Sequence, residues 1–244
     1  MPTLLVTGAS AGIGRAVAER FLAEGWNVAL MARRAGPLAE IAAGRAGALP
    51  LPGDVTSATD IDTAFAATAE RFGRIDVLFN NAGIFPPAAL IDALSVEDWR
   101  AAVDVNLTGM FLAARAAFAA MRRQDPQGGR IINNGSISAH APRPGSVAYT
   151  TTKHAITGLT KALELDGRAF GISCGQIDIG NARTALSAGF DKGMAQADGS
   201  VRPEPMMELA PAVEAVLLMA RMPPDATVPF LTVTAQGMPW IGRG

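Results

Sequence analysis

The segment Thr3-Leu4-Leu5-Val6-Thr7-Gly8-Ala9-Ser10-Ala11-Gly12-Ile13-Gly14 decides the fold of this chain. Its first five residues are apolar or β-branched, which is typical of a strand buried on both faces of a sheet. Gly8 ends this run, and from Gly12 to Glu24 apolar residues recur at the spacing of a helix. A buried strand that passes through a glycine-rich turn into a helix predicts the first unit of a parallel α/β sheet.

The same alternation of short β-rich runs and longer helical patterns continues along the chain. Strands that alternate with helices of ten or more residues form right-handed crossover units, which cover both faces of a parallel sheet. The sequence therefore predicts a single domain, residues 1–244, with a Rossmann-type doubly wound parallel sheet of about seven strands and helices on both faces. Further strands are predicted at 27–32, 47–51, 75–79, 131–132, 171–177 and 230–233, and further helices at about 57–72, 96–123, 149–168 and 208–222.

One segment, residues 185–205, interrupts the alternation because it shows no clear periodicity. Connections of this length are uncommon in compact domains, and those that occur are usually functional or mobile. The segment contains Gly189, Gly193 and Gly199, which lower the cost of backbone changes. We expect a mobile lid over a substrate; the alternative is an ordered helical segment packed permanently on the core.

Composition excludes several other classes of protein. The 21 Lys and Arg balance 22 Asp and Glu to a formal net charge of -1, which provides no basic surface for nucleic acid and no membrane tether. The single cysteine, Cys174, cannot form an intrachain disulfide, which favours a reducing compartment. We find no secretory signal and no uninterrupted run of about 20 mostly apolar residues, so we expect a soluble cytoplasmic protein.

The turn from Gly8 to Gly14 has the properties of a binding site for a pyrophosphate. Glycines allow a tight turn and a close approach of the backbone, and the following helix offers unpaired N–H groups and a positive dipole end. The spacing Gly-x-x-x-Gly-x-Gly differs from the Gly-x-Gly-x-x-Gly dinucleotide fingerprint, and a plain turn is the alternative. The turn also lacks the Gly-Lys-Ser/Thr ending of a P-loop, which argues against a kinase or an ATPase.

The end of the second predicted strand indicates which dinucleotide binds. A carboxylate there would bind the ribose 2′-OH of NAD, whereas an arginine nearby would accommodate the 2′-phosphate of NADP. The sequence has Arg33 and Arg34 at this point and no acidic residue. A planar guanidinium suits a phosphate, although two such arginines can also be a solvated surface pair. We therefore expect NADP in preference to NAD.

Tyr149, the single tyrosine of the chain, precedes Lys153 by four residues in a predicted helix. Residues four apart share one face of a helix, and a nearby cation is expected to lower the pKa of the phenol towards the range of an acid–base catalyst. The same spacing is also common in solvated pairs. Ser136, however, ends the fifth predicted strand, and ligands of such sheets bind at the carboxyl ends of the strands. A hydroxyl, a phenol and an ammonium are therefore predicted at one site.

These residues resemble the short-chain dehydrogenase/reductase family over roughly residues 4–184. Residues 7–14 look like its TGxxxGxG loop, residues 54–55 like its adenine-contacting Asp, and residues 80–83 match its NNAG motif. Asn106 matches the family's asparagine in the catalytic helix. The remaining match is to the family's Ser–Tyr–Lys set, here Ser136, Tyr149 and Lys153.

The resemblance implies a role for each matched residue. Tyr149 would be the general acid or base, Ser136 would hold and polarise the substrate oxygen, and Lys153 would bind the nicotinamide ribose and lower the pKa of Tyr149. Asn106 would position a water that links Lys153 to solvent. The implied cofactor contacts are Gly8, Ser10, Gly12, Ile13, Gly14, Arg33, Arg34, Asp54, Val55, Asn81, Ala82, Gly83, Tyr149, Lys153, Ala182 and Thr184.

The chain departs from the family pattern at three places. Ala11 stands where NADP-dependent members often carry a basic residue, and Ile179 stands where the family usually has proline, so we expect a looser base for residues 185–205. Residues 234–240 replace the usual Val-Asp-Gly-Gly ending, and the interface at that end is expected to differ from the family's tetramer. A homodimer or homotetramer is still expected, because the predicted helix over 112–121 is apolar around much of its circumference and a second subunit would bury its apolar surface.

Three further residues have simpler interpretations. His140 is interpreted as a rim or substrate-loop residue, and no metal site is expected, because the chain has two histidines and no cluster of ligands at metal-binding spacing. Arg143 is interpreted as a solvated loop arginine, although an anionic substrate group is an alternative partner. Cys174 is interpreted as a small buried residue.

The sequence thus predicts an NADP(H)-dependent oxidoreductase that acts on a small-molecule ketone or secondary alcohol. The cofactor would carry the hydride, and the protein would orient the cofactor and handle the proton. Two alternatives stay open. One is a catalytically silent protein that senses dinucleotides, and the other is an enzyme that keeps the cofactor for dehydration or epimerisation.

Overall fold

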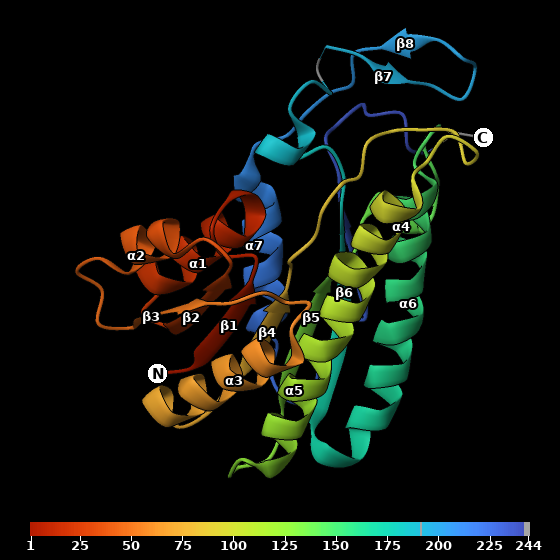
Figure 1. Cartoon of the computed structure of the whole chain (residues 1–244). Coiled ribbons are helices and arrows are strands. Elements are labelled where there is room, and N and C mark those ends of the chain that lie inside the picture. Colours follow the sequence, from red (N-terminus) through yellow and green to blue (C-terminus); the bar gives the residue numbers. More distant parts are fainter. Residues whose placement is uncertain (191, 242–244) are drawn as a thin grey trace.

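A computed structural model of the chain describes residues 1–190 and 192–241 (Figure 1). Its main sheet has seven strands in the order β3-β2-β1-β4-β5-β6-β9, all of them parallel. The order reverses between β1 and β4, so the connecting helices lie on both faces, and the predicted doubly wound α/β fold is confirmed. The strands are β1 (Thr3–Thr7), β2 (Asn27–Ala32), β3 (Ala48–Pro52), β4 (Val77–Asn80), β5 (Gly129–Asn134), β6 (Ile172–Ile179) and β9 (Phe230–Val233).

Seven α-helices cover the sheet in the described part of the chain. They are α1 (Gly12–Ala23), α2 (Ala35–Ala42), α3 (Ala58–Phe72), α4 (Val96–Val103), α5 (Gly109–Arg123), α6 (Val147–Gly167) and α7 (Leu209–Ala220).

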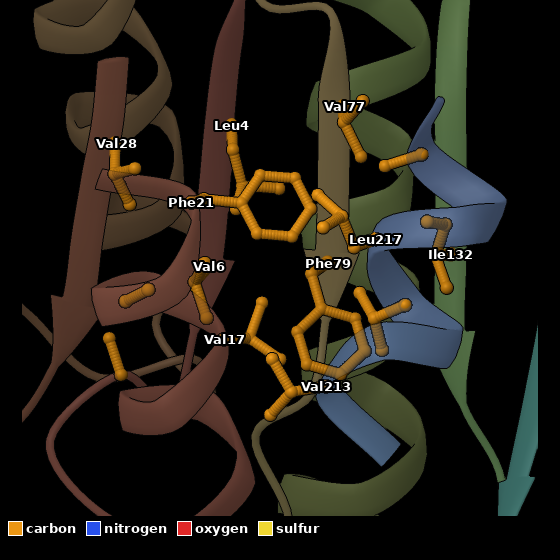
Figure 2. Close-up of a cluster of buried hydrophobic side chains, with 14 of the residues drawn as sticks. Leu4, Val6, Val17, Phe21, Val28, Val77, Phe79, Ile132, Val213 and Leu217 are labelled. Atoms are coloured by element: carbon orange, nitrogen blue, oxygen red, sulfur yellow. The ribbon is translucent and has the colours of Figure 1, made fainter. Parts of the chain in front are cut away.

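The core on one face lies between the sheet and helices α1, α2 and α7. In Figure 2, Val6 of β1 and Phe79 of β4 point towards Val17 of α1 and Val213 of α7. Leu5, the neighbour of Val6, belongs instead to the cluster on the opposite face, with side chains from α3, α5 and α6. Alternate residues of β1 therefore serve two cores, which explains why its sequence is an unbroken apolar run.

The predicted helix 96–123 is interrupted by a π-helical turn, η1 (Asp104–Thr108), between α4 and α5. Such turns occur mostly at functional sites. By length and composition alone the helical stretch Val96–Arg123 would suffice to span a membrane, although charged residues such as Arg100 and Arg115 interrupt its sequence. Within the fold, 44% of its apolar window is buried, and α5 contributes Ala113 and Ala117 to the second core.

Two further features differ from the sequence prediction. Helix α2 was not predicted, because the helix has only eight residues and these include glycine and proline. Residues 185–205 contain a short 3-10 turn, η4 (Ala185–Ser187), and an antiparallel hairpin of β7 (Met194–Ala195) and β8 (Val201–Arg202), seen at the top of Figure 1. Asp191, within this segment, lies outside the described residues.

Candidate active site

A cavity of about 750 Å³ runs along the carboxyl edge of the sheet, since its lining residues follow β1, β2, β3, β4, β5 and β6. In open α/β sheets this edge, at the reversal of strand order, is where ligands bind. Gly14 and Asn106 are not among its lining residues. The predicted site residues that line it are Gly8, Ser10, Gly12, Ile13, Arg33, Arg34, Asp54, Val55, Asn81, Ala82, Gly83, Ser136, Tyr149, Lys153, Ala182 and Thr184.

Three glycines shape the first end of the cavity. Gly8 and Gly12 have φ angles of +69° and +54°, a region that favours glycine. A Cβ atom at Gly14 would lie 2.4 Å from the carbonyl oxygen of Gly8 and 2.5 Å from Nδ2 of Asn81. A side chain at Gly14 would therefore force the loop away from α1, which explains the spacing Gly-x-x-x-Gly-x-Gly.

Hydrogen bonds tie this glycine loop to the segments after β4 and β5. The Thr7 hydroxyl accepts from the backbone N–H groups of Asn81 and Ala82, at 2.9 and 3.0 Å. The Asn81 amide donates to the carbonyl oxygen of Thr7 at 2.9 Å, and its Oδ1 accepts from Asn134 at 2.9 Å. These hydrogen bonds join the glycine loop and the segments after β4 and β5 into one wall of the cavity.

The donors around the glycine loop fit the phosphates of a dinucleotide. Ala11 precedes α1 and gives no side-chain cap, so the first-turn N–H groups keep their capacity for an anion. Arg34 donates to the Ser10 hydroxyl at 3.1 Å, and the exposed Arg33 lines the same part of the cavity. Glycines, helix N–H groups and guanidinium groups therefore gather in one cradle.

Ser136 and Tyr149 meet at the other end of the cavity. Ser136 follows β5 after one residue, Gly135, and Tyr149 lies in the first turn of α6. Burial raises the pKa of Tyr149 above its ordinary value, and a hydrogen bond with Ser136 opposes this shift without cancelling it. The negative charge of Asp178 adds to the rise, whereas the positive charge of Arg143 reduces it.

Lys153 is buried one helical turn after Tyr149. Its Nζ donates to the carbonyl oxygen of Asn134 at 2.7 Å and lies 5.5 Å from the centre of the Tyr149 ring. Burial lowers the pKa of Lys153 to about 8, and the negative charge of Asp178 opposes this shift. The pKa of Tyr149 is thus raised rather than lowered as predicted, because burial of the phenol outweighs the opposing effects of Ser136 and Arg143.

Asn106 lies in the π-helical turn with its side chain buried. Its Oδ1 accepts from the backbone N–H of Ile84 at 2.7 Å, and its Nδ2 donates to the carbonyl oxygen of Ile84 at 2.9 Å. A Cβ atom at Gly83 would lie 3.3 Å from this Oδ1. Asn106 thus fixes the chain after β4, and its predicted water relay to Lys153 stays a prediction.

The base of segment 185–205 is closed by hydrogen bonds. The backbone N–H of Arg183 donates to Met207, and that of Met207 donates to Asn181, both at 2.9 Å. Ala182 forms a bridge with the same Met207, and the Thr184 hydroxyl caps the turn that follows. These contacts pair the two ends of the segment, and the expected loosening by Ile179 stays a prediction.

The prediction that Arg143 is a solvated loop residue is wrong, since only 8% of the residue is exposed. Its Nη1 and Nη2 donate to the two carboxylate oxygens of Glu204, each at 2.7 Å, and Nη2 also donates to Asn181 at 2.8 Å. Glu204 lies 61 positions after Arg143 in the sequence, so no local sequence pattern could predict this ion pair.

Asp178 is a second residue that the sequence analysis missed. It is fully buried at the end of β6, where Oδ1 accepts from the backbone N–H of Ser136 at 2.8 Å and Oδ2 lies 2.8 Å from Nε2 of His140. A Cβ atom at Gly135 would lie 2.1 Å from Oδ1, so glycine is required there. An acidic residue inside an apolar strand is the signal that could have identified it. His140 has 43% of its side chain exposed and is not among the residues that line the cavity, so its interpretation as a rim residue stays a prediction.

Cys174 is buried in β6, and burial raises the pKa of its thiol well above the usual value. This agrees with the interpretation of a small buried residue. Within residues 1–190 and 192–241, the structure has no group of three or more His, Cys, Asp or Glu placed to hold a metal ion.

Comparison with known sequences identifies the family. A family model described as short chain dehydrogenase matches residues 2–195. The 3beta-hydroxysteroid dehydrogenase of Mediterraneibacter gnavus is 35% identical over 189 residues, which cover 75% of this chain and 67% of that protein. The 2-(R)-hydroxypropyl-CoM dehydrogenase of Xanthobacter autotrophicus is 39% identical over 190 residues, which cover 75% of each chain.

Solved structures agree with this assignment. The 3-ketoacyl-(acyl-carrier-protein) reductase from Brucella melitensis, complexed with NADH, has a TM-score of 0.84 at 26% identity and covers 95% of this chain and 96% of its own. The alcohol dehydrogenase from the archaeon Thermococcus sibiricus, complexed with 5-hydroxy-NADP, has a TM-score of 0.81 at 25% identity and covers 96% of both chains. Fold, cavity and sequence thus agree that this chain belongs to the short-chain dehydrogenase family of oxidoreductases.

Proposed function

We propose that the chain is an NADP(H)-dependent oxidoreductase that interconverts a small ketone and a secondary alcohol, with Tyr149 as general acid or base. One observation carries the proposal: Ser136, Tyr149 and Lys153 line the same cavity as the glycine loop. A cradle for a dinucleotide and a group able to transfer a proton therefore share one cavity, as hydride transfer to a carbonyl requires.

When bound, the nicotinamide ring supplies the hydride in reduction and accepts it in oxidation. In reduction, the Ser136 hydroxyl holds the carbonyl oxygen and the Tyr149 phenol donates a proton to that oxygen. A phenol of raised pKa stays protonated at neutral pH, which suits this role. The Lys153 ammonium, 5.5 Å from the ring centre, stabilises the phenolate that proton transfer leaves behind. We assign Asn106 to the path by which the proton is replaced.

The preference for NADP rests on Arg33 and Arg34, which line the cavity beside Ser10. A guanidinium binds phosphate through paired, charge-assisted hydrogen bonds. The solved relatives include one complexed with NADH and one with an NADP analogue, so the preference depends on the residues of this chain. Asp54 and Val55 are assigned to the adenine, and the other contacts proposed for the cofactor are Asn81, Ala82, Gly83, Ala182 and Thr184.

An absorbance assay of the cofactor tests the function. Purified protein is mixed with NADPH or NADH and a panel of small ketones, and with the oxidised cofactors and a panel of alcohols. We expect ketone-dependent consumption of NADPH that is faster than that of NADH. Cofactor binding without turnover on every panel member would favour the silent sensor, and product formation without net cofactor change would favour a dehydratase or epimerase.

We further propose that the protein works in the cytoplasm as a homodimer or homotetramer. Phe111 of α5 is 49% exposed and Leu165 of α6 is 64% exposed, and a second subunit would cover such side chains. Light scattering would give the mass of the assembly, and a monomer would contradict this part of the proposal.

A further inference from the structure

A buried ion pair stands at the substrate end of the cavity. Arg143, from the segment between β5 and α6, lines the cavity, and Glu204 comes from the end of segment 185–205. Two parallel hydrogen bonds of 2.7 Å join the guanidinium to both carboxylate oxygens. The two side chains are only 6% and 1% exposed, so little water screens or replaces this contact.

Neutral side chains hold the Glu204 carboxylate in place. Asn181 donates to Oε2 at 2.8 Å, and Gln196 donates to Oε1 at 3.0 Å. Burial opposes the ionisation of Glu204, but the hydrogen bonds from Arg143, Asn181 and Gln196 outweigh it and keep the pKa of this carboxyl below its usual range. The Glu204 carboxylate therefore carries a negative charge at neutral pH, which offsets the charge of the guanidinium that it contacts.

Aromatic rings connect this pair with the proposed reaction centre. The guanidinium carbon of Arg143 lies 5.2 Å from the centre of the Phe190 ring. The Phe190 and Phe85 ring centres are 6.3 Å apart, and those of Phe85 and Tyr149 are 4.6 Å apart. The backbone N–H of Glu204 donates to the carbonyl oxygen of Phe190 at 3.0 Å, so one segment carries both the carboxylate and the ring. An aromatic wall of this kind suits the apolar body of a ligand.

We propose that Glu204 is a specificity-determining residue, which neutralises Arg143 so that the cavity selects uncharged ketones or alcohols with an apolar body and rejects those that carry a carboxylate. This inference rests on the proposed oxidoreductase function. A substrate carboxylate beside Phe190 would need donors that Arg143 already gives to Glu204 and Asn181, and it would lie near a like charge. Without the Glu204 charge, the same guanidinium would bind such a carboxylate through paired hydrogen bonds.

A matched pair of ketones tests this inference. Methyl 4-acetylbenzoate and 4-acetylbenzoate share the aromatic ring and the reacting ketone, and they differ in the charge at the far end. For the wild-type enzyme with NADPH, we expect kcat/KM for the ester to exceed that for the acid by about 100-fold, because the acid would lose its hydration while the donors of Arg143 stay engaged by Glu204 and Asn181. Equal values, or a higher value for the acid, would overturn the inference and leave the oxidoreductase function standing.

Two variants then assign the effect to Glu204. Glu204→Gln should raise the ratio of kcat/KM for the acid to that for the ester by about tenfold or more, because a charge-assisted contact becomes available. The double variant Arg143→Gln with Glu204→Gln should lose this gain. Asp198→Asn removes an exposed carboxylate from the same segment and should leave the ratio unchanged.

The outcomes separate this inference from the function on which it rests. An unchanged ratio in folded Glu204→Gln would overturn the role of Glu204. Should that variant fail to fold, the wild-type ratio decides alone. Absence of turnover with every ketone tested would overturn the oxidoreductase function and this inference together.

Discussion

The two ends of the cavity are built in different ways. At the glycine-loop end the backbone forms the wall, and a Cβ atom at Gly14 would lie 2.4 Å from the Gly8 carbonyl oxygen. At the other end side chains form the wall, and Arg143 pairs with Glu204 from 61 positions away. A backbone cradle suits a group that is common to many ligands, whereas side chains can be exchanged without disturbing the sheet. The end of the cavity that would bind the common part of a ligand therefore has a recognisable sequence motif, whereas the end that would bind the variable part does not.

The two buried cations of the cavity repeat this contrast. Arg143 is held by the Glu204 carboxylate, whereas Lys153 donates to a neutral acceptor, the carbonyl oxygen of Asn134. Burial of a cation against a neutral acceptor is costly, and the pKa of Lys153 accordingly falls to about 8. The fold thus places Lys153, whose burial as a cation is costly, beside Tyr149, and it places Arg143, whose charge is neutralised by Glu204, at the opposite end from the glycine loop.

The largest expected effect comes from Tyr149→Phe, which removes the phenol but retains the ring that contacts Phe85. We expect turnover to fall by about 10²–10⁴-fold, the usual contribution of a general acid or base. The Kd for NADPH, measured by fluorescence titration, should change by less than about threefold. Turnover within about threefold of the wild type, in a folded variant, would remove Tyr149 from the proton-transfer step.

A smaller effect is expected at the cofactor end from Arg33→Ala. Loss of a charge-assisted phosphate contact should weaken NADPH binding by roughly 10–100-fold and NADH binding much less. Arg45→Ala, at another exposed arginine, serves as the matched control. Equal weakening of both cofactors, or a wild type that prefers NADH, would show that Arg33 does not select NADP.

Lys153→Met sharpens the contrast between the two cations. The pKa of Lys153 is about 8 in the folded chain, whereas its ordinary value, taken for the unfolded chain, is 10.5. At pH values between about 8 and 10.5, Lys153 is therefore protonated less often in the folded chain than in the unfolded chain. The cost of burying the charge is therefore full below pH 8 and shrinks as pH rises. Between pH 7 and pH 9.5 the free energy of unfolding of the wild type should rise by about 2 kcal/mol relative to the variant.

Chemical denaturation at several pH values measures this difference. Lys161→Met, at an exposed lysine of the same helix, should show no such change relative to wild type. A constant difference between wild type and Lys153→Met across this pH range would mean that Lys153 is not buried as a costly cation.

The smallest expected effect concerns the proposed lid, residues 185–205. Its base is paired through Met207, so we expect strong protection from hydrogen exchange there in every state. Protection of residues 186–200 should rise when cofactor and substrate bind. Equal, strong protection of 186–200 in the free enzyme and in the ternary complex would favour a permanently packed segment.

Most of the fold could be predicted because buried parallel strands are short apolar runs and their helices repeat at a regular spacing. The turn Asp104–Thr108 could not, since a helical spacing in the sequence does not distinguish one wider turn from the α-helical turns around it. The cavity end built by glycines was predictable because only glycine fits there. Arg143 and Asp178 were not, because their partners Glu204 and Ser136 are neighbours only in the folded chain.

The central claim is that this cavity transfers a hydride to a substrate carbon. The most direct test uses NADPH with deuterium at both C4 positions and a ketone that the absorbance assay shows to be consumed, followed by mass spectrometry of the alcohol. We predict one deuterium on the carbinol carbon of each product molecule. Alcohol without deuterium, formed while the labelled cofactor is present, would contradict the claim.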